Sequence, residues 1–236
     1  MSEGATLVVG DGPPGFRLAR GLTDLGAAVT VLGDPGAARA AGEVWSGPTS
    51  PSDLSSSSAV DASLRAALDP GPLEVLVWAR VPVAPEDIGE LASLEEKDWE
   101  RLAEEPITEF LHLLQGASSH LSPGSSVALI APSLVLVGAP HVVGWTAAAE
   151  GQRSLLRVAA RRWGSRGVSL NCVAVPAHIL CGAPAPLDRA GGPPASLGRQ
   201  PTMDGEVAAV VAHLASMTGS VTGATVAVDG GSWMTP

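Results

Sequence analysis

The 236-residue sequence contains no tyrosine, and Lys97 is its only lysine. A reaction in which a tyrosine hydroxyl donates a proton beside a lysine therefore lacks the tyrosine that it needs. Cysteine is also scarce, because only Cys172 and Cys181 occur. Two cysteines make no disulfide framework, and we interpret them as small buried apolar residues. No cluster of residues has the spacing of metal ligands, so the sequence predicts no metal site.

Positive charge is the second shortage. Lysine and arginine number 14 against 24 aspartates and glutamates, which gives a formal net charge of −10. This balance argues against nucleic acid or an anionic membrane as a partner. Apolar residues make up 45% of the chain and charged residues 16%, which is typical of a folded protein. The length favours a single domain that covers residues 1–236.

Long uninterrupted apolar runs are missing as well. The longest apolar segment, 126–145, is broken by prolines and a glycine, which indicates a buried strand and a loop. The first residues lack the basic start and sustained apolar run of a signal peptide. We therefore expect a cytoplasmic protein that does not span a membrane.

What the sequence does have is an alternation of apolar runs and helical periodicity. The run 5–9 leads into the Gly-rich turn 10–15, a helical segment at 16–26 and a second apolar run at 27–33. This order is a βαβ unit, and continuous apolar strands imply a parallel sheet covered on both faces. Further strands are predicted at 73–79, 126–131, 167–175 and 223–231. Helices are predicted at 95–105 leading into 107–117, with a kink or restart at Pro106, and at 146–164. The segments 47–58 and 176–201 are interpreted as loops. The predicted fold class is α/β: a Rossmann-like, doubly wound parallel sheet with helices on both faces.

Several stretches in this order resemble the short-chain dehydrogenase/reductase (SDR) family over nearly the whole chain. They are the Gly-rich first turn, "LEVLV" (73–77), "DWERL" (98–102), "LVGAP" (136–140), "WGSRGVSLNCVA" (163–174) and the ending "VTGATVAVDGG" (221–231). The resemblance implies a Rossmann-like fold, an NAD(P) cofactor and a Ser-Tyr-Lys-Asn catalytic group. Each implied position can be compared with the residue that this sequence holds there.

The phosphate loop of the family reads Thr-Gly-x-x-x-Gly-x-Gly. Here Gly15 matches one glycine of that pattern, with Gly10 and Gly12 beside it. Such a loop binds a pyrophosphate through backbone N–H groups, and Pro13 and Pro14 have none to offer. The glycines are residual candidates for cofactor binding, although a plain strand-to-helix turn explains them as well.

Three charged residues complete the implied cofactor site. Asp11 brings a carboxylate to the place where two phosphates would lie, and Arg17 could offset its charge. Asp53 matches the acid that commonly contacts adenine in the family, but a helix N-cap explains it equally. The bulky segment "WARV" (78–81) replaces the family's small Asn-Asn-Ala-Gly residues. We expect no bound cofactor, or weak NAD(P) binding at most.

The catalytic positions implied by the resemblance hold other residue types. Trp145 takes the tyrosine position, Ala149 the lysine position, Pro132 the serine position and Pro106 the asparagine position. An indole N–H does not titrate in a useful range, and alanine supplies no cation. Other groups near the implied substrate site are His141, His178, Ser133 and Glu150, each of which an ordinary loop, turn or helix position explains.

Three functional hypotheses follow. The first is a non-catalytic SDR-like subunit in a homodimer, homotetramer or hetero-oligomer with an intact SDR. The exposed charge rows Arg153, Arg157, Arg161 and Glu104, Glu105, Glu109 could pair there across a two-fold axis, or could simply be solvated. The second is an oxidoreductase, or another enzyme, that acts on a small hydrophobic carbonyl compound by an unconventional mechanism. The third is a dinucleotide or metabolite sensor.

Overall fold

Continuous apolar runs form a single parallel sheet in the computed structural model. The structure describes residues 4–40, 42, 44–68, 71–80, 91–138, 142–181 and 194–234. Its strands are β1 (Ala5–Val9), β2 (Ala28–Leu32), β3 (Thr49–Ser50), β4 (Leu73–Trp78), β5 (Leu121–Pro132), β6 (Ser169–Val175) and β7 (Thr225–Ala227). They lie in the order β3-β2-β1-β4-β5-β6-β7, and all neighbours are parallel. The predicted α/β, Rossmann-like fold is confirmed.

The helices lie between the strands in sequence, as crossovers of a parallel sheet require. They are α1 (Pro13–Asp24), α2 (Pro35–Ala40), α3 (Ser57–Ala67), α4 (Glu96–Trp99), α5 (Glu105–Ala117), α6 (Val143–Trp163), α7 (Ala177–Cys181) and α8 (Ala208–Ser216). Short 3₁₀ turns cover Leu91–Ser93, Ser133–Leu136 and Gly164–Arg166, and π-helical turns cover Glu100–Glu104 and Met203–Val207.

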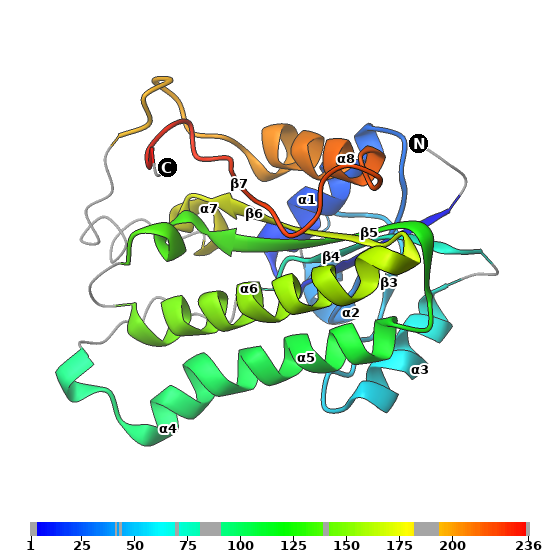
Figure 1. Cartoon of the computed structure of the whole chain (residues 1–236), viewed down its shortest axis with the longest axis horizontal. Helices are drawn as coiled ribbons and strands as arrows, with labels where there is room; N and C mark the ends of the chain where they lie inside the picture. Colours follow the sequence, from blue (N-terminus) through cyan, green and yellow to red (C-terminus); the bar gives the residue numbers. More distant parts are fainter. Residues whose placement is uncertain are drawn as a thin grey trace.

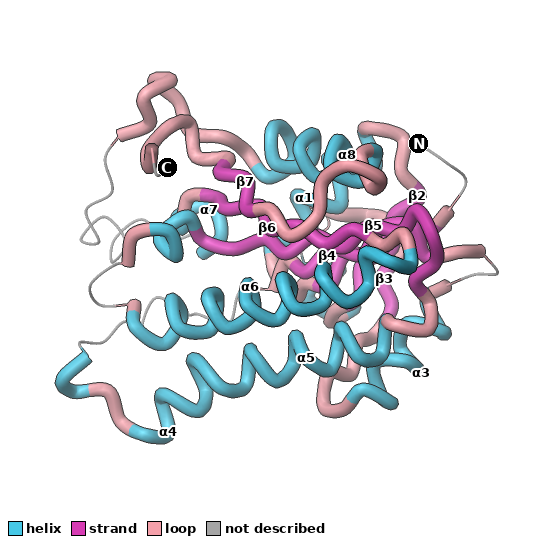
Figure 2. Tube along the Cα trace, in the orientation of Figure 1, coloured by secondary structure: helices cyan, strands magenta, loops and turns pink. Residues whose placement is uncertain are grey.

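Two apolar clusters fill the space between these helices and the two faces of the sheet. One cluster includes Phe16 and Leu22 of α1 and Val211 of α8. The other includes Leu64 of α3 and Phe110 of α5. Figure 1 shows α1 and α8 above the sheet and α3, α5 and α6 below it, and Figure 2 shows the strands as the layer between them. This three-layer arrangement leaves the strand ends as the place for a site.

Several element boundaries differ from the predictions. The predicted loop 47–58 contains strand β3, which is too short to give an alternating pattern. Helix α1 begins at Pro13 because proline, which has no N–H to pair, suits a first helical turn. The last strand is limited to Thr225–Ala227, and Gly230 and Gly231 follow it with φ angles of +66° and +77° that favour glycine.

The helix that contains Pro106 restarts, as its sequence predicts. Pro106 has no N–H and cannot bond to the carbonyl one turn earlier. The chain forms the π-helical turn Glu100–Glu104 immediately before it, and α5 then begins at Glu105 with Pro106 in its first turn. The restart places the first turn of α5 beside α6.

Candidate functional site

The topology of the sheet points to one crevice. Strand β1 pairs with β2 on one side and with β4 on the other, so the chain changes direction between β1 and β4. Ligands of open α/β sheets bind at such a switch point, outside the carboxyl ends of the strands. Gly10 and Asp11 follow β1, and Ala79 and Arg80 follow β4. These four residues form the entrance of the candidate crevice.

The Gly-rich turn makes close backbone contacts there. A Cβ atom on Gly10 would lie 3.2 Å from the Ala79 carbonyl oxygen and 3.3 Å from the Gly15 Cα. Gly12 is the N-cap residue of α1, with extended backbone and no side chain to cap the helix. The N–H of Phe16 already donates to the Gly12 carbonyl at 3.2 Å. The predicted glycines therefore come together, and they serve close packing of the turn.

The Asp11 carboxylate, at the end of β1, contacts residues that follow the strands on either side of β1. Its Oδ1 accepts a hydrogen bond from the backbone N–H of Asp34, after β2, at 3.1 Å. Its Oδ2 lies 3.3 Å from Nη1 of Arg80, after β4. The partner of Asp11 is thus Arg80 and not the predicted Arg17, which is exposed on α1.

Arg80 also contacts a second carboxylate. Its Nη2 lies 3.2 Å from Oε1 of Glu109, which projects from α5. Burial raises the pKa of the Glu109 carboxyl above its usual value, although the Arg80 guanidinium acts in the opposite direction and Asp11 adds to the increase. We call Asp11, Arg80 and Glu109 the switch-point triad.

The arrangement of the triad is unfavourable for a dinucleotide diphosphate. Two carboxylates and one guanidinium leave a formal charge of −1 beside the turn. The first two residues of α1 are prolines, which have no N–H groups for a phosphate. Each like-charge contact near 4 Å costs about 1–4 kcal/mol in the range from water to a protein surface. The guanidinium that could attract a phosphate is occupied by the two carboxylates.

Asp53 is exposed beside the end of the β3 segment. Its Oδ1 accepts a hydrogen bond from the Ser55 N–H at 2.9 Å, and hydrogen bonding to Ser55 lowers the pKa of Asp53. The N-cap residue of α3 is Ser56, whose hydroxyl accepts from the Ala59 N–H. The N-cap interpretation of Asp53 is therefore wrong, and its carboxylate instead stabilises a turn ahead of the helix.

The residues that the resemblance puts at the tyrosine and lysine positions are buried. Trp145, in the first turn of α6, is 4% exposed and belongs to the same apolar cluster as Leu134 and Val175. Ala149, one turn later, is 2% exposed and faces the other cluster. Pro132 ends β5 and pairs in register with Val175, the last residue of β6. Apolar side chains thus occupy the β5–β6 side of the crevice.

One polar side chain crosses from α6 to α5 in this region. The Gln152 Nε2 donates a hydrogen bond to the carbonyl oxygen of Pro106 at 2.9 Å, and Gln152 is 5% exposed. A neutral amide neither supplies nor removes a proton near neutral pH. The contact fixes the two helices and offers no acid–base group.

The other candidates are not brought together. Ser133 is buried in the 3₁₀ turn after β5, and His178 is exposed in α7. His141 lies outside the described residues. Glu150 binds Arg153 on its own helix, at 2.6 Å from Nη2. In the described part of the chain, no group of three or more His, Cys, Asp or Glu residues could hold a metal ion.

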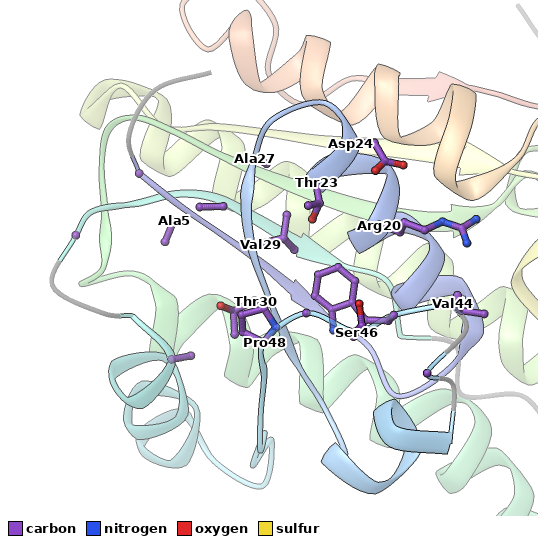
Figure 3. Close-up of a pocket in the computed structure, with 17 residues that line it drawn as sticks. Ala5, Arg20, Thr23, Asp24, Ala27, Val29, Thr30, Val44, Ser46 and Pro48 are labelled. Atoms are coloured by element: carbon purple, nitrogen blue, oxygen red, sulfur yellow. The ribbon is translucent and has the colours of Figure 1, made fainter.

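A separate cavity of about 770 Å³ lies at the opposite edge of the sheet. Figure 3 shows it at the amino ends of β1 and β2, beside the end of α1. Its lining includes the charged residues Arg20 and Asp24, and Arg20 forms an ion pair with Asp204. The cavity therefore lies away from the switch point and has its cation already paired.

Comparisons with known proteins assign the family. The model of the family described as enoyl-(acyl carrier protein) reductase matches residues 15–232. A cis-4-hydroxycyclohexanecarboxylate dehydrogenase from Sinomonas cyclohexanicum is 34% identical over 173 residues, which are 71% of this chain and 68% of that protein. The chain belongs to the short-chain dehydrogenase/reductase family. An uncharacterised short-chain-type dehydrogenase/reductase from Sinorhizobium fredii is 37% identical over 122 residues, 48% of this chain but only 22% of the longer relative.

Solved SDR structures support the fold. A dehydrogenase/reductase from Sinorhizobium meliloti superposes with a TM-score of 0.80 at 22% identity, over 98% of this chain and 96% of that one. A 3-ketoacyl-(acyl-carrier-protein) reductase from Brucella melitensis, in complex with NADH, gives a TM-score of 0.78 at 18% identity over 98% of both chains. No helix in the described residues is long and apolar enough to cross a membrane. The named relatives fit an SDR oxidoreductase better than a non-catalytic subunit.

Sequence reasoning missed the switch-point triad. It identified Asp11 as an unfavourable charge and "WARV" (78–81) as bulky, but it did not pair them. The pairing of Arg80 with Asp11 could have been predicted, because each residue directly follows an apolar strand. The carboxyl ends of these strands, β1 and β4, meet at the switch point. Glu109 gave no such signal, since it comes from the middle of a helix.

Proposed function

We propose that this chain is a non-catalytic SDR-like subunit that assembles as a homo-oligomer or with an intact SDR. The supporting observation is the packing at the start of α6. Trp145 and Ala149 are part of buried apolar clusters, at the positions where the family resemblance implies a proton donor and its lysine partner. Proton transfer by a positioned acid contributes about 10²–10⁴-fold to such a reaction. No tyrosine elsewhere in the sequence can take that role.

The outer face of α5 and α6 supports an assembly role. These helices lie side by side on one face of the sheet (Figure 1), and Val158 and Leu111 on them are 66% and 37% exposed. Fewer residues of the predicted arginine and glutamate rows are free to contact a second subunit than the sequence suggests, because some are paired within the chain. Arg153 is bound to Glu150, and Glu109 to Arg80. Arg157 and Arg161 of α6 and Glu105 of α5 remain exposed and available for a second subunit. Glu104, in the turn before α5, is also exposed, but its carboxylate accepts a hydrogen bond from Nε1 of Trp99 at 2.8 Å.

Sedimentation velocity of the purified chain tests this proposal. We expect a dimer or tetramer, or a monomer that enters a stable complex when mixed with intact SDRs encoded beside it. Val158→Glu should weaken the assembly, whereas Ala→Glu at the exposed position Ala66 of α3 serves as a control. A chain that stays monomeric alone and in every mixture contradicts the proposal.

The comparisons favour a second candidate, an SDR oxidoreductase that acts on a small hydrophobic carbonyl compound by an unconventional mechanism. The relatives are named as dehydrogenases or reductases, and one solved structure holds NADH. Trp145 and the cluster around it could form the wall of an apolar substrate pocket. That cluster includes Ala177 and Leu180 of α7, the helix that also carries His178. A relative's reaction transfers to this chain only if its own residues can perform the chemistry.

Turnover assays separate the two candidates. The intact chain is supplied with NADH or NADPH and a panel of cyclic and aliphatic ketones, and oxidation of the cofactor is followed by absorbance. We expect no substrate-dependent oxidation. Turnover that His178→Ala abolishes would establish the oxidoreductase and remove the non-catalytic proposal.

A further inference from the structure

The triad bridges the strands between which the chain reverses direction. Asp11 follows β1 and Arg80 follows β4, so their ion pair spans the switch point itself. Glu109 reaches the same guanidinium from α5. The side chains of Asp11, Arg80 and Glu109 are 39%, 30% and 26% exposed, so all three lie at the surface of the crevice and not in its core.

The two ion pairs of Arg80 are long and single, so they hold the guanidinium only weakly. The two N–O distances are 3.3 Å and 3.2 Å, longer than the roughly 2.7–2.9 Å of strong charge-assisted hydrogen bonds. Each carboxylate takes one of the two terminal nitrogens, so neither forms the bidentate pair that arginine makes best. A phosphate could supply that bidentate partner if the carboxylates did not compete for the guanidinium.

We propose that the switch-point triad is an internal closure of the crevice, in which Asp11 and Glu109 keep Arg80 from binding a diphosphate. This inference rests on the proposed function, because it explains how an SDR scaffold excludes its dinucleotide. The formal charge of the triad controls whether a diphosphate can bind. Neutralising one carboxylate raises that charge from −1 to 0, and neutralising both raises it to +1. Arg80 then becomes the residue that binds the phosphate.

Charge-neutralising variants of the full chain test the closure. Asp11→Asn and Glu109→Gln retain the size and an acceptor oxygen of each side chain, so the hydrogen bond from Asp34 to residue 11 can persist. Binding of NADH and of inorganic pyrophosphate is measured by calorimetry at constant salt. Asp61→Asn is the matched control, because it removes one negative charge from the ion pair that Asp61 forms with Arg65 on α3, away from the triad.

We expect the unmodified chain to bind NADH with a Kd above about 1 mM, which corresponds to about −4 kcal/mol. Each single neutralisation should tighten binding about tenfold and the double variant about a hundredfold, in line with the cost of one like-charge contact at the surface. Asp61→Asn should leave the affinity unchanged. Adding Arg80→Ala to the double variant should remove the gain for both NADH and pyrophosphate.

Three results would overturn the closure. They are tight NADH binding by the unmodified chain, no gain in the folded single or double variants, and a gain that survives Arg80→Ala. Circular dichroism establishes that each variant is folded, and Glu109→Gln alone is decisive if the Asp11→Asn chain does not fold. Failure here leaves the proposed function standing, since that proposal depends on turnover and assembly. Conversely, turnover of micromolar NADH by the unmodified chain would overturn both proposals, because the cofactor must bind before it can be oxidised.

Discussion

Charged side chains occupy the crevice on its β1–β4 side, whereas apolar side chains occupy it on the β5–β6 side. On the first side, Asp11, Arg80 and Glu109 are each partly exposed and hold one another through single contacts. On the second, Trp145 and Ala149 are packed into the two cores of the protein. The two sides of the crevice are therefore closed in ways that differ in how easily they can be reversed.

The difference has a physical origin. A partly exposed ion pair contributes about 0–1 kcal/mol, because solvent screens it, so replacing one of its members barely affects folding. A buried apolar side chain belongs to close packing that tolerates neither an added volume nor an unpaired charge. Cofactor binding should therefore be recoverable by one or two substitutions, whereas the family's lysine cannot be reintroduced at position 149 without destabilising the packing around it.

Introducing the missing lysine is the strongest test of this contrast. Ala149→Lys places an ammonium group and three additional carbons at a site that is 2% exposed. We expect the free energy of unfolding to fall by about 3–5 kcal/mol, because the core is overpacked and the charge is desolvated. Urea denaturation measures the loss. Ser154→Lys, at an exposed site of the same helix, should change stability by no more than about 0.5 kcal/mol. An equally stable Ala149→Lys protein would mean that this side of the crevice is open.

Gly33→Ala tests whether the β1–β4 side also contains a rigid part. A Cβ atom there would lie 2.5 Å from the Gly10 carbonyl oxygen and 2.9 Å from Oδ1 of Asp11. Because a backbone oxygen cannot move aside as a side chain can, we expect a loss of about 1–3 kcal/mol on thermal or urea unfolding. Gly219→Ala is the control, since a Cβ atom on Gly219 meets nothing within 4 Å. If Gly33→Ala lowers the free energy of unfolding no more than Gly219→Ala does, the backbone at the strand ends on this side can shift to accommodate a methyl group.

The two sides also differ in how well the sequence predicts them. The sheet follows from continuous apolar runs such as 5–9 and 73–79, because strands covered on both faces have no polar alternation. Strand β3 has two residues, Thr49 and Ser50, and its position depends on pairing with β2, which no local pattern encodes. The single-sequence prediction therefore gives the fold class and misses the shortest edge strand.

The geometry of the site follows from the sequence where the backbone decides it, but not where side chains choose their partners. The close approach of Gly10 to Ala79 follows from the Gly-rich turn after a strand. Arg80 could have paired with any nearby acid, and only the placement of α5 selects Glu109. Similarly, Arg153 fits an exposed row by its spacing, but it binds Glu150 three residues away on its own helix. Which of several nearby acids an arginine pairs with depends on distances in the folded protein. The spacing of these residues along the sequence does not determine those distances.

The contact between Gln152 and Pro106 offers a milder test of the apolar side. Gln152→Leu retains the size of the side chain but removes the donor that reaches the Pro106 carbonyl at 2.9 Å. We expect a loss of about 1–2 kcal/mol in urea denaturation, the usual cost when one partner of a buried hydrogen bond is removed. Gln115→Leu, on the exposed face of α5, is the matched control and should be nearly neutral. Equal stabilities of the two variants would show that this polar contact does not hold α5 and α6 together.

The smallest expected effect is a pH dependence of stability on the charged side. Burial raises the pKa of Glu109 above the ordinary value of 4.5, so the folded protein retains this proton to a higher pH than the unfolded chain does. Its contribution to stability is therefore fully present below pH 4.5 and declines as the pH rises through the raised pKa. Relative to Glu109→Gln, the unmodified chain should become less stable over that window, as measured by urea denaturation at a series of pH values.

Glu206 provides the control with the opposite sign. The Thr202 N–H donates to its carboxylate at 3.0 Å, and hydrogen bonding to this backbone group lowers the pKa of Glu206 to about 2. Stability from this group is present above pH 4.5 and is lost as the pH falls toward 2, so the difference from Glu206→Gln should increase with pH. A Glu109→Gln profile that runs parallel to the Glu206→Gln profile would mean that Arg80 outweighs burial at Glu109. In that case Arg80 holds Glu109 more firmly than an easily opened closure allows, and the two sides of the crevice would be closed with similar strength.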